Sequence, residues 1–277
     1  MIALTADEFE ILTDWIYRKT GIRYEVKKRY FLTKRIEKRM DALGLTSVTE
    51  YIRTLRFADP RSQELQRLID LLTINETYFF RDFSQLQAFG EHCLMEIVAG
   101  KAETGERRLR VWSAGCSTGE EPYTLGIILR EMVDDIDAWE ITIEAGDIDR
   151  SVLEKARAGV YEPRSLRDLP AVYLERYFHK LPNDTYRINK TIRDMVTFEH
   201  INLSDKVAIR QKRGFDFIFC RNLLIYFDDV SRKRLVDQLY VALNPSGYIF
   251  LGASESIGRI STAFRIKRMG GYIVYCK

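Results

Sequence analysis

The pattern of hydrophobic residues changes character near residue 108, and this change constrains the fold more than any other feature of the chain. From Leu109 onward, runs typical of buried β-strands alternate with runs of helical periodicity. Strands that alternate with helices are the signature of a parallel sheet covered by helices, because parallel strands need a crossover connection. Residues 109–277 are therefore expected to form one α/β domain.

The alternation predicts individual elements of this domain. Strands are expected at residues 109–114, 139–148, 215–220, 247–253 and 271–277, and helices at 120–133, 151–158 and 230–243. The segment from about residue 160 to 196 departs from the pattern. It contains a helical stretch at 170–177 and then two short strand-like runs around a Pro-Asn-Asp turn. We interpret this segment as a small inserted subdomain that carries an antiparallel hairpin.

The chain before residue 108 has helical patterns only. Capping boxes begin at Thr5 and Ser47, and glycines at 21 and 44 mark helix ends. These signals predict helices that end at Gly21, at 26–43, from Ser47 to near Pro60, at 62–74 and at 82–99. Residues 101–108, KAETGERR, are polar and are expected to form a linker. We predict an N-terminal helical domain in residues 1–84, and a helix and linker in residues 85–108.

Length and composition exclude several classes of protein. The 277 residues allow one large domain or two modest ones, and 46% hydrophobic residues suffice for a packed core. A net charge of +3 is too small for a dedicated nucleic-acid-binding domain. No apolar run reaches the ~18 residues of a membrane span. The N-terminus also lacks the basic and apolar regions of a signal peptide. A cytoplasmic location is therefore expected, without membrane insertion.

The cysteines and histidines do not form a metal-binding motif. Four cysteines and three histidines are scattered along the chain, without a CxxC pair. Structural zinc sites need four such ligands at short spacings. No metal is therefore expected, and the cysteines are expected to be reduced.

The strongest local motif is VWSAGCSTGEEP at residues 111–122. An expected strand runs into a loop that contains Gly115 and Gly119, and a helix begins at once. Glycine lets the backbone approach a ligand closely, and open α/β sheets bind nucleotides at the carboxyl end of the first strand. Asp147 lies at the end of the second expected strand, where a carboxylate can accept hydrogen bonds from both hydroxyls of a ribose.

This loop contains neither GxGxxG nor the GK[ST] of a P-loop. Glu120 and Glu121 lie where a pyrophosphate would need positive potential, so they disfavour a dinucleotide. Two carboxylates suit a cationic ligand such as S-adenosylmethionine (SAM), which has a sulfonium and an amino group. Acidic residues also favour the first turn of any helix, so this simpler interpretation stays open. Together with Asp147 and a final hairpin, the loop resembles the arrangement of SAM-dependent methyltransferases.

Five longer segments carry a more specific resemblance. They are NETYFFRD (75–82), VWSAGCSTGEEPYTLG (111–126), GDIDRSVLEKARAGVY (146–161), FCRNLLIYFD (219–228) and FLGASES (250–256). In these segments, and in their order, the chain resembles the CheR family of chemotaxis methyltransferases. The resemblance implies an all-helical N-terminal domain, a Rossmann-like SAM-binding α/β domain and a small antiparallel β-subdomain inserted into it. It also implies methyl transfer from SAM to glutamate side chains of chemoreceptors.

The resemblance carries over to site residues position by position. The cofactor would be bound by Asn75, Thr77, Arg81, Gly115, Glu120 or Glu121, Asp147, Asn202, Leu203, Arg221 and Asn222. Arg81 and Tyr226 would lie nearest the transferred methyl group and are the candidate catalytic residues. Simpler interpretations remain for three of them: Tyr226 as a core aromatic, Asn75 as a helix cap and Arg81 in a surface ion pair with Asp82 or Glu76.

The implied reaction needs no general base. A glutamate side chain, with a pKa of about 4.3, is already ionised at neutral pH. Its oxygen can therefore attack a sulfonium methyl group directly, and the scarcity of histidine is no obstacle. A pocket that excludes water and aligns the reacting atoms should supply much of the catalysis. We expect Arg81 to orient the substrate carboxylate and Tyr226 to position the methyl group or the substrate.

Residues 18–39 contain ten basic and two acidic residues. The apolar positions of this segment fall close to one helical face, which leaves much of the charge outward. The resemblance favours docking of this basic helix on the acidic helical bundle of a chemoreceptor. The docking residues would be Lys27, Lys28, Lys34, Arg35, Lys38 and Arg39. Without the resemblance, a solvated helix face or non-specific RNA affinity would explain the charge equally well.

The inserted hairpin refines the expectation. Some members of the family bind a C-terminal pentapeptide of the receptor at this subdomain, and they resemble one another in a longer, glycine-rich turn. Here the connection is LPND (181–184), which is short and free of glycine. We therefore expect a protein that does not use the pentapeptide. We also expect a monomer that is recruited to receptor arrays. The alternatives are a SAM-binding scaffold without activity, an NAD-dependent oxidoreductase, and a methyltransferase of small molecules or RNA.

Overall fold

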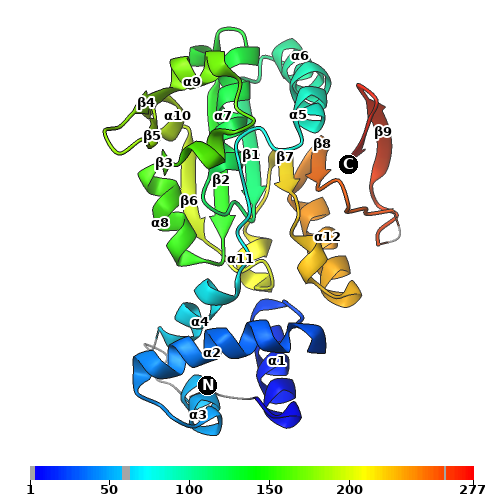
Figure 1. Cartoon of the computed structure of the whole chain (residues 1–277). Coiled ribbons are helices and arrows are strands. Elements are labelled where there is room, and N and C mark those ends of the chain that lie inside the picture. Colours follow the sequence, from blue (N-terminus) through cyan, green and yellow to red (C-terminus); the bar gives the residue numbers. More distant parts are fainter. Residues whose placement is uncertain (1–3, 58–62, 259) are drawn as a thin grey trace.

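The computed structural model describes residues 4–57, 63–258 and 260–277 and confirms the expected fold class. An all-helical N-terminal region lies below the carboxyl ends of the strands of an α/β domain (Figure 1). A second, small antiparallel sheet lies beside the main one. Within the described residues, no helix is long and apolar enough to cross a membrane. The proposed limits of the domains at residues 84 and 108 stay predictions.

The helical region begins and ends its helices where the capping residues predict. Helix α1 (Ala6–Thr20) has the complete capping box at Thr5 and ends at Gly21, whose φ is 72°. Helix α2 (Arg29–Leu43) follows a 3₁₀ turn at Val26–Lys28 and ends at Gly44. Helices α3 (Val48–Phe57) and α4 (Glu64–Leu72) complete the region. The expected helix end near Pro60 and helix start at Ser62 lie outside the described residues.

A single interrupted helix connects this region to the sheet. It consists of α5 (Phe83–Ala88), a π-helical segment (Phe89–Leu94) and α6 (Met95–Glu103). The helix therefore continues past Ala99 into the segment that was expected to be a linker, which leaves only residues 104–107 as a connection. The π-helical segment places the Phe89 ring edge-on against Phe217, Phe219 and Phe250 of the sheet. This aromatic packing anchors the helix to the centre of the core.

The main sheet has seven strands in the order β6-β2-β1-β7-β8-β10-β9. The strands are β1 (Arg108–Ala114), β2 (Glu140–Asp147), β6 (Val196–His200), β7 (Phe215–Cys220), β8 (Leu243–Leu251), β9 (Arg265–Met269) and β10 (Tyr272–Cys276). The first five in this order are parallel, whereas β10 runs antiparallel to both of its neighbours. The strand order reverses at β1 and β7, and a sheet of this kind binds its ligand in the crevice at that point.

Two strands of this sheet, β6 and β9, were not predicted from the sequence. Strand β6 lies at one edge, directly after the inserted segment, and was not separated from it. Strand β9 lies at the other edge and has the sequence RIKRM, whose charges obscure the alternation of a half-buried strand. Charged side chains are common on edge strands because they discourage pairing with other chains. The other helices of the domain are α7 (Glu120–Met132), α8 (Arg150–Ala158), α11 (Lys206–Arg210) and α12 (Asp229–Ala242).

The inserted segment forms the small sheet, in the strand order β3-β5-β4. Its elements are β3 (Val160–Tyr161), a 3₁₀ turn (Pro163–Leu166), α9 (Ala171–Tyr177), β4 (Phe178–Lys180), β5 (Tyr186–Ile188) and α10 (Lys190–Arg193). The expected hairpin is thus confirmed as β4 and β5. Its tight connection is closed by a hydrogen bond from the Leu181 N–H to the Thr185 carbonyl at 2.8 Å.

Candidate active site

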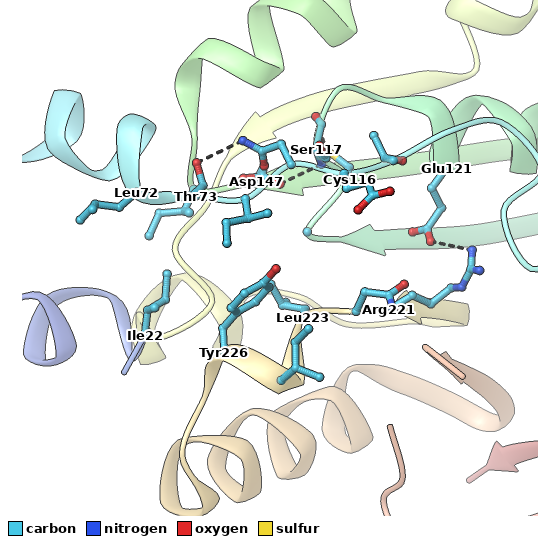
Figure 2. Close-up of a pocket in the computed structure, with 18 of the residues that line it drawn as sticks. Ile22, Leu72, Thr73, Cys116, Ser117, Glu121, Asp147, Arg221, Leu223 and Tyr226 are labelled. Carbon is cyan, nitrogen blue, oxygen red and sulfur yellow. Dashed lines mark hydrogen bonds and ion pairs between the residues drawn. The ribbon is translucent and has the colours of Figure 1, made fainter. Parts of the chain in front are cut away.

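A cavity of about 330 Å³ opens at the carboxyl ends of β1, β2 and β7, the point predicted from the strand order (Figure 2). Its volume is in the range of small-molecule sites. The loops after these three strands form one side, and the chain from Leu72 to Arg81 crosses it. Residues between Ile22 and Phe31 of the helical region form the opposite wall. The site is therefore built between two regions that are distant in sequence.

The loop after β1 is held in a conformation that turns its backbone toward the cavity. Gly115 has a φ of 86° and its N–H donates to the Gly146 carbonyl at 2.8 Å. Ser117 also has a positive φ, of 49°, and its N–H donates to Asp147 Oδ2 at 2.8 Å. A Cβ atom at Gly119 would lie 2.9 Å from Ala156 Cβ, so a side chain there would push helices α7 and α8 apart. This loop is thus fixed by its neighbours before any ligand binds.

Asp147 lies at the end of β2, lines the cavity and is only 8% exposed. Its carboxylate accepts hydrogen bonds from the N–H groups of Ser117 and Asp149. Burial raises the pKa of Asp147 to about 6, because desolvation outweighs the stabilising backbone hydrogen bonds. Hydroxyl donors from a ribose would compensate for this desolvation, as the sequence predicts for a nucleoside ligand.

The structure distinguishes between the two glutamates at the start of α7. Glu121 lines the cavity, accepts a hydrogen bond from Ser113 Oγ at 2.7 Å, and pairs with Arg221 at 3.2 Å (Figure 2). Glu120 is 2% exposed, does not line the cavity and accepts from Thr118 Oγ1 at 2.6 Å. Burial raises the pKa of Glu120. Of the two, Glu121 therefore has the geometry to bind a ligand amino group.

The NETYFFRD segment crosses the cavity as irregular chain, so Asn75 caps no helix. Its side-chain amide donates to Asp149 Oδ2 at 2.9 Å and to Thr73 Oγ1 at 3.1 Å. Thr77 and Arg81 line the cavity with it. The Arg81 guanidinium donates to the Glu76 carbonyl at 2.7 Å, and no ion pair with a carboxylate is seen for it among the described residues. The simpler interpretations of Asn75 and Arg81 therefore do not describe their observed contacts.

The loop after β7 contributes Arg221, Asn222 and Tyr226 to the lining. Arg221 is 8% exposed and donates to Asp82 Oδ2 at 2.6 Å and to the Arg81 carbonyl at 2.8 Å. With its bond to Glu121, it ties the crossing segment to α7. Tyr226 is half-buried and directs its ring into the cavity (Figure 2). Burial raises the pKa of Tyr226, which stays a neutral hydroxyl, although the nearby Arg81 charge lowers it.

Besides Glu120, two predicted cofactor residues do not reach this cavity. Asn202 donates its amide to the Lys19 carbonyl at 2.6 Å, at the end of α1. Leu203 is 8% exposed and packs in the hydrophobic core on the α12 side of the sheet. In the structure neither residue lines the site: Asn202 joins the sheet domain to the helical region, and Leu203 belongs to the core of the sheet domain.

The structure reveals contributors that the sequence did not single out. Asp149 is fully buried, caps α8 and accepts from Thr73, Asn75 and the Ser151 N–H. Glu255 accepts the N–H groups of Asn222 at 2.8 Å and Ile225 at 3.3 Å. Glu255 lies within the FLGASES motif, but nothing in that motif indicates a partner more than 30 residues away. For Asp149, in contrast, the sequence does contain a signal, because an aspartate directly before an expected helix is typical of an N-cap.

The helical wall is joined to the same loop through its backbone. The Arg23 N–H donates to the Tyr226 carbonyl at 3.1 Å, and Ile22 forms an antiparallel bridge with Phe227. Gly21 lies so close to the sheet domain that a Cβ atom would be 2.2 Å from Ser204 Oγ. Tyr24 closes the wall by donating its hydroxyl to the Leu72 carbonyl at 3.0 Å.

The six expected docking residues are not equivalent. Lys27 and Lys28 border the cavity and are exposed. Farther along α2, Arg35 stacks on Phe31 at 3.8 Å, Lys34 pairs with Glu37, and Lys38 is exposed. Arg39 is different, because its guanidinium donates twice to Glu64, which is 4% exposed. The structure thus removes Arg39 from the docking surface, since its side chain is committed to the core of the helical region.

The residues around the cavity fit SAM. The carboxylates of Asp147 and Glu121 could accept hydrogen bonds from the ribose hydroxyls and the amino group of SAM. The apolar side chains of Leu72, Ile148 and Leu223 also line the cavity and suit contact with a flat base. Ser117 Oγ and Arg221 Nε are buried without a hydrogen-bond partner among the described residues, as expected of groups at a ligand site. In that same part of the chain, no cluster of His, Cys, Asp and Glu side chains is arranged to hold a metal.

Comparison with known proteins agrees with this geometry. The "CheR methyltransferase, all-alpha domain" family matches residues 7–73, and the "CheR methyltransferase, SAM binding domain" family matches residues 75–273. Chemotaxis protein methyltransferase 2 of Vibrio cholerae is 42% identical over 96% of this chain and 91% of its own length. The chemotaxis protein methyltransferase of Escherichia coli K12 is 33% identical over 99% and 92%. That of Borreliella burgdorferi is 33% identical over 92% and 90%.

Among solved structures, magnesium protoporphyrin IX methyltransferase of Synechocystis with bound SAM covers 99% of this chain and 97% of its own. Its TM-score of 0.35 and 12% identity are too low to support any inference. The family matches, by contrast, span almost the whole chain and coincide with the helical region and the sheet domain. The chain therefore belongs to the CheR methyltransferase family, with an all-α domain and a SAM-binding domain.

Proposed function

We propose that this protein transfers a methyl group from SAM to glutamate side chains of chemoreceptors and forms glutamate methyl esters. One observation carries the proposal. The cavity combines carboxylates suited to a cationic nucleoside (Asp147 and Glu121) with an arginine and a tyrosine at the other end, and no histidine is among its described lining residues. Such a site can hold an anionic acceptor without a general base, which matches the chemistry of an ionised carboxylate.

Bound SAM supplies an electrophilic methyl group, and the protein's own residues arrange what surrounds it. Asp147 would accept hydrogen bonds from the ribose hydroxyls, and Glu121 would accept one from the amino group. Asn75, Thr77, Gly115, Arg221 and Asn222 shape the cofactor pocket. The Arg81 guanidinium, free of carboxylate partners among the described residues, binds and orients the incoming glutamate. The neutral Tyr226 hydroxyl positions the acceptor oxygen, and the surrounding walls exclude water, which strengthens these interactions.

The partner in this proposal is the cytoplasmic helical bundle of a chemoreceptor, and the protein acts as a monomer recruited to receptor arrays. Lys27 and Lys28 border the cavity, and Lys34, Arg35 and Lys38 continue the positive surface along α2. An acidic bundle would be steered toward this surface and so toward the cavity mouth. Affinity for the receptor is expected to fall as salt is raised, because exposed charges are screened.

The short β4–β5 connection supports recognition without a receptor tether. Leu181 to Thr185 form a closed turn that offers no additional loop for a peptide strand. We therefore expect no tight binding of the receptor's C-terminal pentapeptide. Isothermal titration calorimetry with that peptide tests this point; binding at low micromolar concentration would contradict it.

The decisive experiment uses labelled SAM and purified receptor cytoplasmic fragments, followed by mass-spectrometric mapping of the methyl groups. Base-labile methyl esters on glutamate are the expected product. SAM binding without transfer to any fragment would instead support a regulatory scaffold. Label on lysine, arginine or RNA would show a methyltransferase with another substrate class.

A further inference from the structure

Two guanidinium groups lie near the ring of Tyr78, a residue that lines the cavity. Arg167 places its guanidinium carbon 3.6 Å from the ring centroid, and Arg81 places its own at 5.7 Å from the same centroid. Tyr78 and Arg81 line the cavity, whereas Arg167 belongs to the inserted segment between β3 and α9. Two positive charges from different parts of the chain therefore meet at one edge of the site.

The platform that carries them is fixed by its neighbours. The N–H of Phe79 donates to the Ser165 carbonyl at 2.9 Å, and the Phe79 ring packs edge-on against Tyr161 and Phe178. Next to it, Phe80 stacks on Tyr173 of α9. Tyr78 precedes these two anchored residues, so the backbone on which its ring stands is held in place. Arg167 is stacked on a built surface and does not simply extend into solvent.

The charge of Arg167 is not balanced locally. Arg167 is exposed, and no carboxylate lies within ion-pair distance of it among the described residues. The guanidinium carbon lies 3.6 Å from the Tyr78 ring centroid, a distance that suits a contact through the face of the planar guanidinium. Its edge N–H donors stay available, and these donors bind a carboxylate with two parallel hydrogen bonds. The residue thus presents a preoriented anion-binding edge beside the cavity.

We infer that Arg167 is a specificity-determining residue, which binds an acidic side chain next to the glutamate that is methylated. Arg81 holds the reacting carboxylate, and Arg167 holds a neighbouring one on the same face of the substrate helix. The site then selects glutamates within acidic sequence surroundings. This inference rests on the proposed function, because it assumes a glutamate acceptor on a receptor.

Steady-state kinetics on a receptor fragment with mapped methyl esters test the inference. The fragment is compared with a version in which the acidic residues beside the target are changed to amides. We expect Arg167→Glu to raise KM for the unmodified fragment about tenfold, because it replaces an attraction with a like-charge contact. The affinity for SAM and kcat should change less than twofold. Arg167→Lys, which keeps the charge but loses the flat stack and the paired donors, should fall in between.

Arg164 provides the matched control, because it is exposed, lies in the same segment and bears the same charge. Arg164→Glu should leave KM within about twofold of wild type, since a rim charge outside the contact contributes little. On a fragment with lysines beside the target, the KM of Arg167→Glu should fall back toward that of wild type on the unmodified fragment. The KM of wild type should rise on this lysine fragment. Arg167→Gln removes the positive charge without adding a negative one, and SAM affinity shows whether a variant is folded. Together the two separate misfolding from lost recognition.

Three outcomes would overturn the inference: equal effects of Arg167→Glu and Arg164→Glu, no discrimination by wild type between acidic and amide surroundings, or a change confined to kcat. The proposed function fails in a different way, since wild type would then form no glutamate ester on any fragment. The two failures are therefore distinguishable in one set of measurements.

Discussion

The two walls of the cavity use charged residues in opposite ways. On the sheet side, Asp147 and Asp149 are almost fully buried, and each accepts hydrogen bonds from N–H or O–H groups of its neighbours. On the helical side, Arg23, Lys27 and Lys28 are exposed: Arg23 lies 3.7 Å from Asp228 and Lys27 pairs with Glu25, and both cations stay largely in solvent. Buried carboxylates with several donors build a rigid site, whereas exposed cations contribute little to stability and remain available to a partner.

Burial, and not charge alone, therefore decides the role of an ionisable residue in this cavity. The sheet wall should be sensitive to the loss of one oxygen atom and insensitive to salt. The helical wall should tolerate single substitutions and respond to salt. Substitutions on the two walls should therefore differ in their effect on stability, turnover and binding.

Replacing Asp149 with alanine should destabilise the protein by about 4 kcal/mol, because Thr73, Asn75 and the first N–H groups of α8 would lose a buried acceptor. Urea unfolding followed by circular dichroism measures the change. Asp205→Ala is the matched control: Asp205 also caps a helix, α11, but is exposed. It should cost only about 1 kcal/mol. Equal losses for the two variants would show that burial of the cap does not matter.

Replacing Arg81 with alanine should lower kcat about a hundredfold, because the substrate carboxylate loses its orienting group in a water-excluding site. Folding should be preserved, since among the described residues the guanidinium donates only to the Glu76 carbonyl. Methyl transfer to a receptor fragment measures the rate, and thermal unfolding checks the fold. Near-normal turnover would remove Arg81 from the catalytic residues.

Two neighbours on α2 separate structure from docking. Arg39→Ala should destabilise the protein by about 2 kcal/mol, because Glu64 would keep a buried charge with fewer donors. Lys38→Ala should leave stability unchanged and weaken receptor binding a few-fold in low salt only. Thermal unfolding and salt-dependent binding measure the two effects. Equal effects on stability would place both side chains in the core and contradict the division of the helix into two faces.

The affinity for SAM should depend on Asp147 ionisation. The pKa of Asp147 in the free protein is about 6, and an ionised carboxylate is the better acceptor for ribose hydroxyls. Affinity should be full above pH 7 and about tenfold lower at pH 5. The stability of the free protein should change in the opposite direction and decrease as pH rises from about 4 to 6, because burial favours the protonated form. Calorimetry should show a flatter pH profile for Asp147→Asn.

Local signals in the sequence predicted most elements. Thr5, Gly21 and Gly44 define helix ends through bonds to residues within four positions, so they are readable without the fold. The edge strand β9 was missed because its charged residues follow from its position at the rim of the sheet, which only the assembled fold reveals. Strand β6 was missed because it is also an edge strand, paired on one side only, and directly follows the inserted segment.

The site shows the same division. Gly115, Glu121, Asp147 and Arg221 belong to long motifs, and the structure brings them to one cavity. The contact of Asn202 with α1 and the burial of Arg39 depend on partners distant in sequence. Such long-range contacts cannot be read from spacing. The sequence also did not predict that residues between Ile22 and Phe31 line the cavity. Only the folded chain brings the end of α1 next to the loop after β7.

The joint between Ile22 and Phe227 has a practical consequence for protein engineering. Arg23 and Tyr226 share a backbone hydrogen bond, so the same few residues end the helical region and complete the reaction chamber. The helical region is therefore not an independent module that can be removed without changing the site of the sheet domain. A chimera that exchanges this region for another domain must retain the chain up to Phe31, or it will lack one side of the cavity.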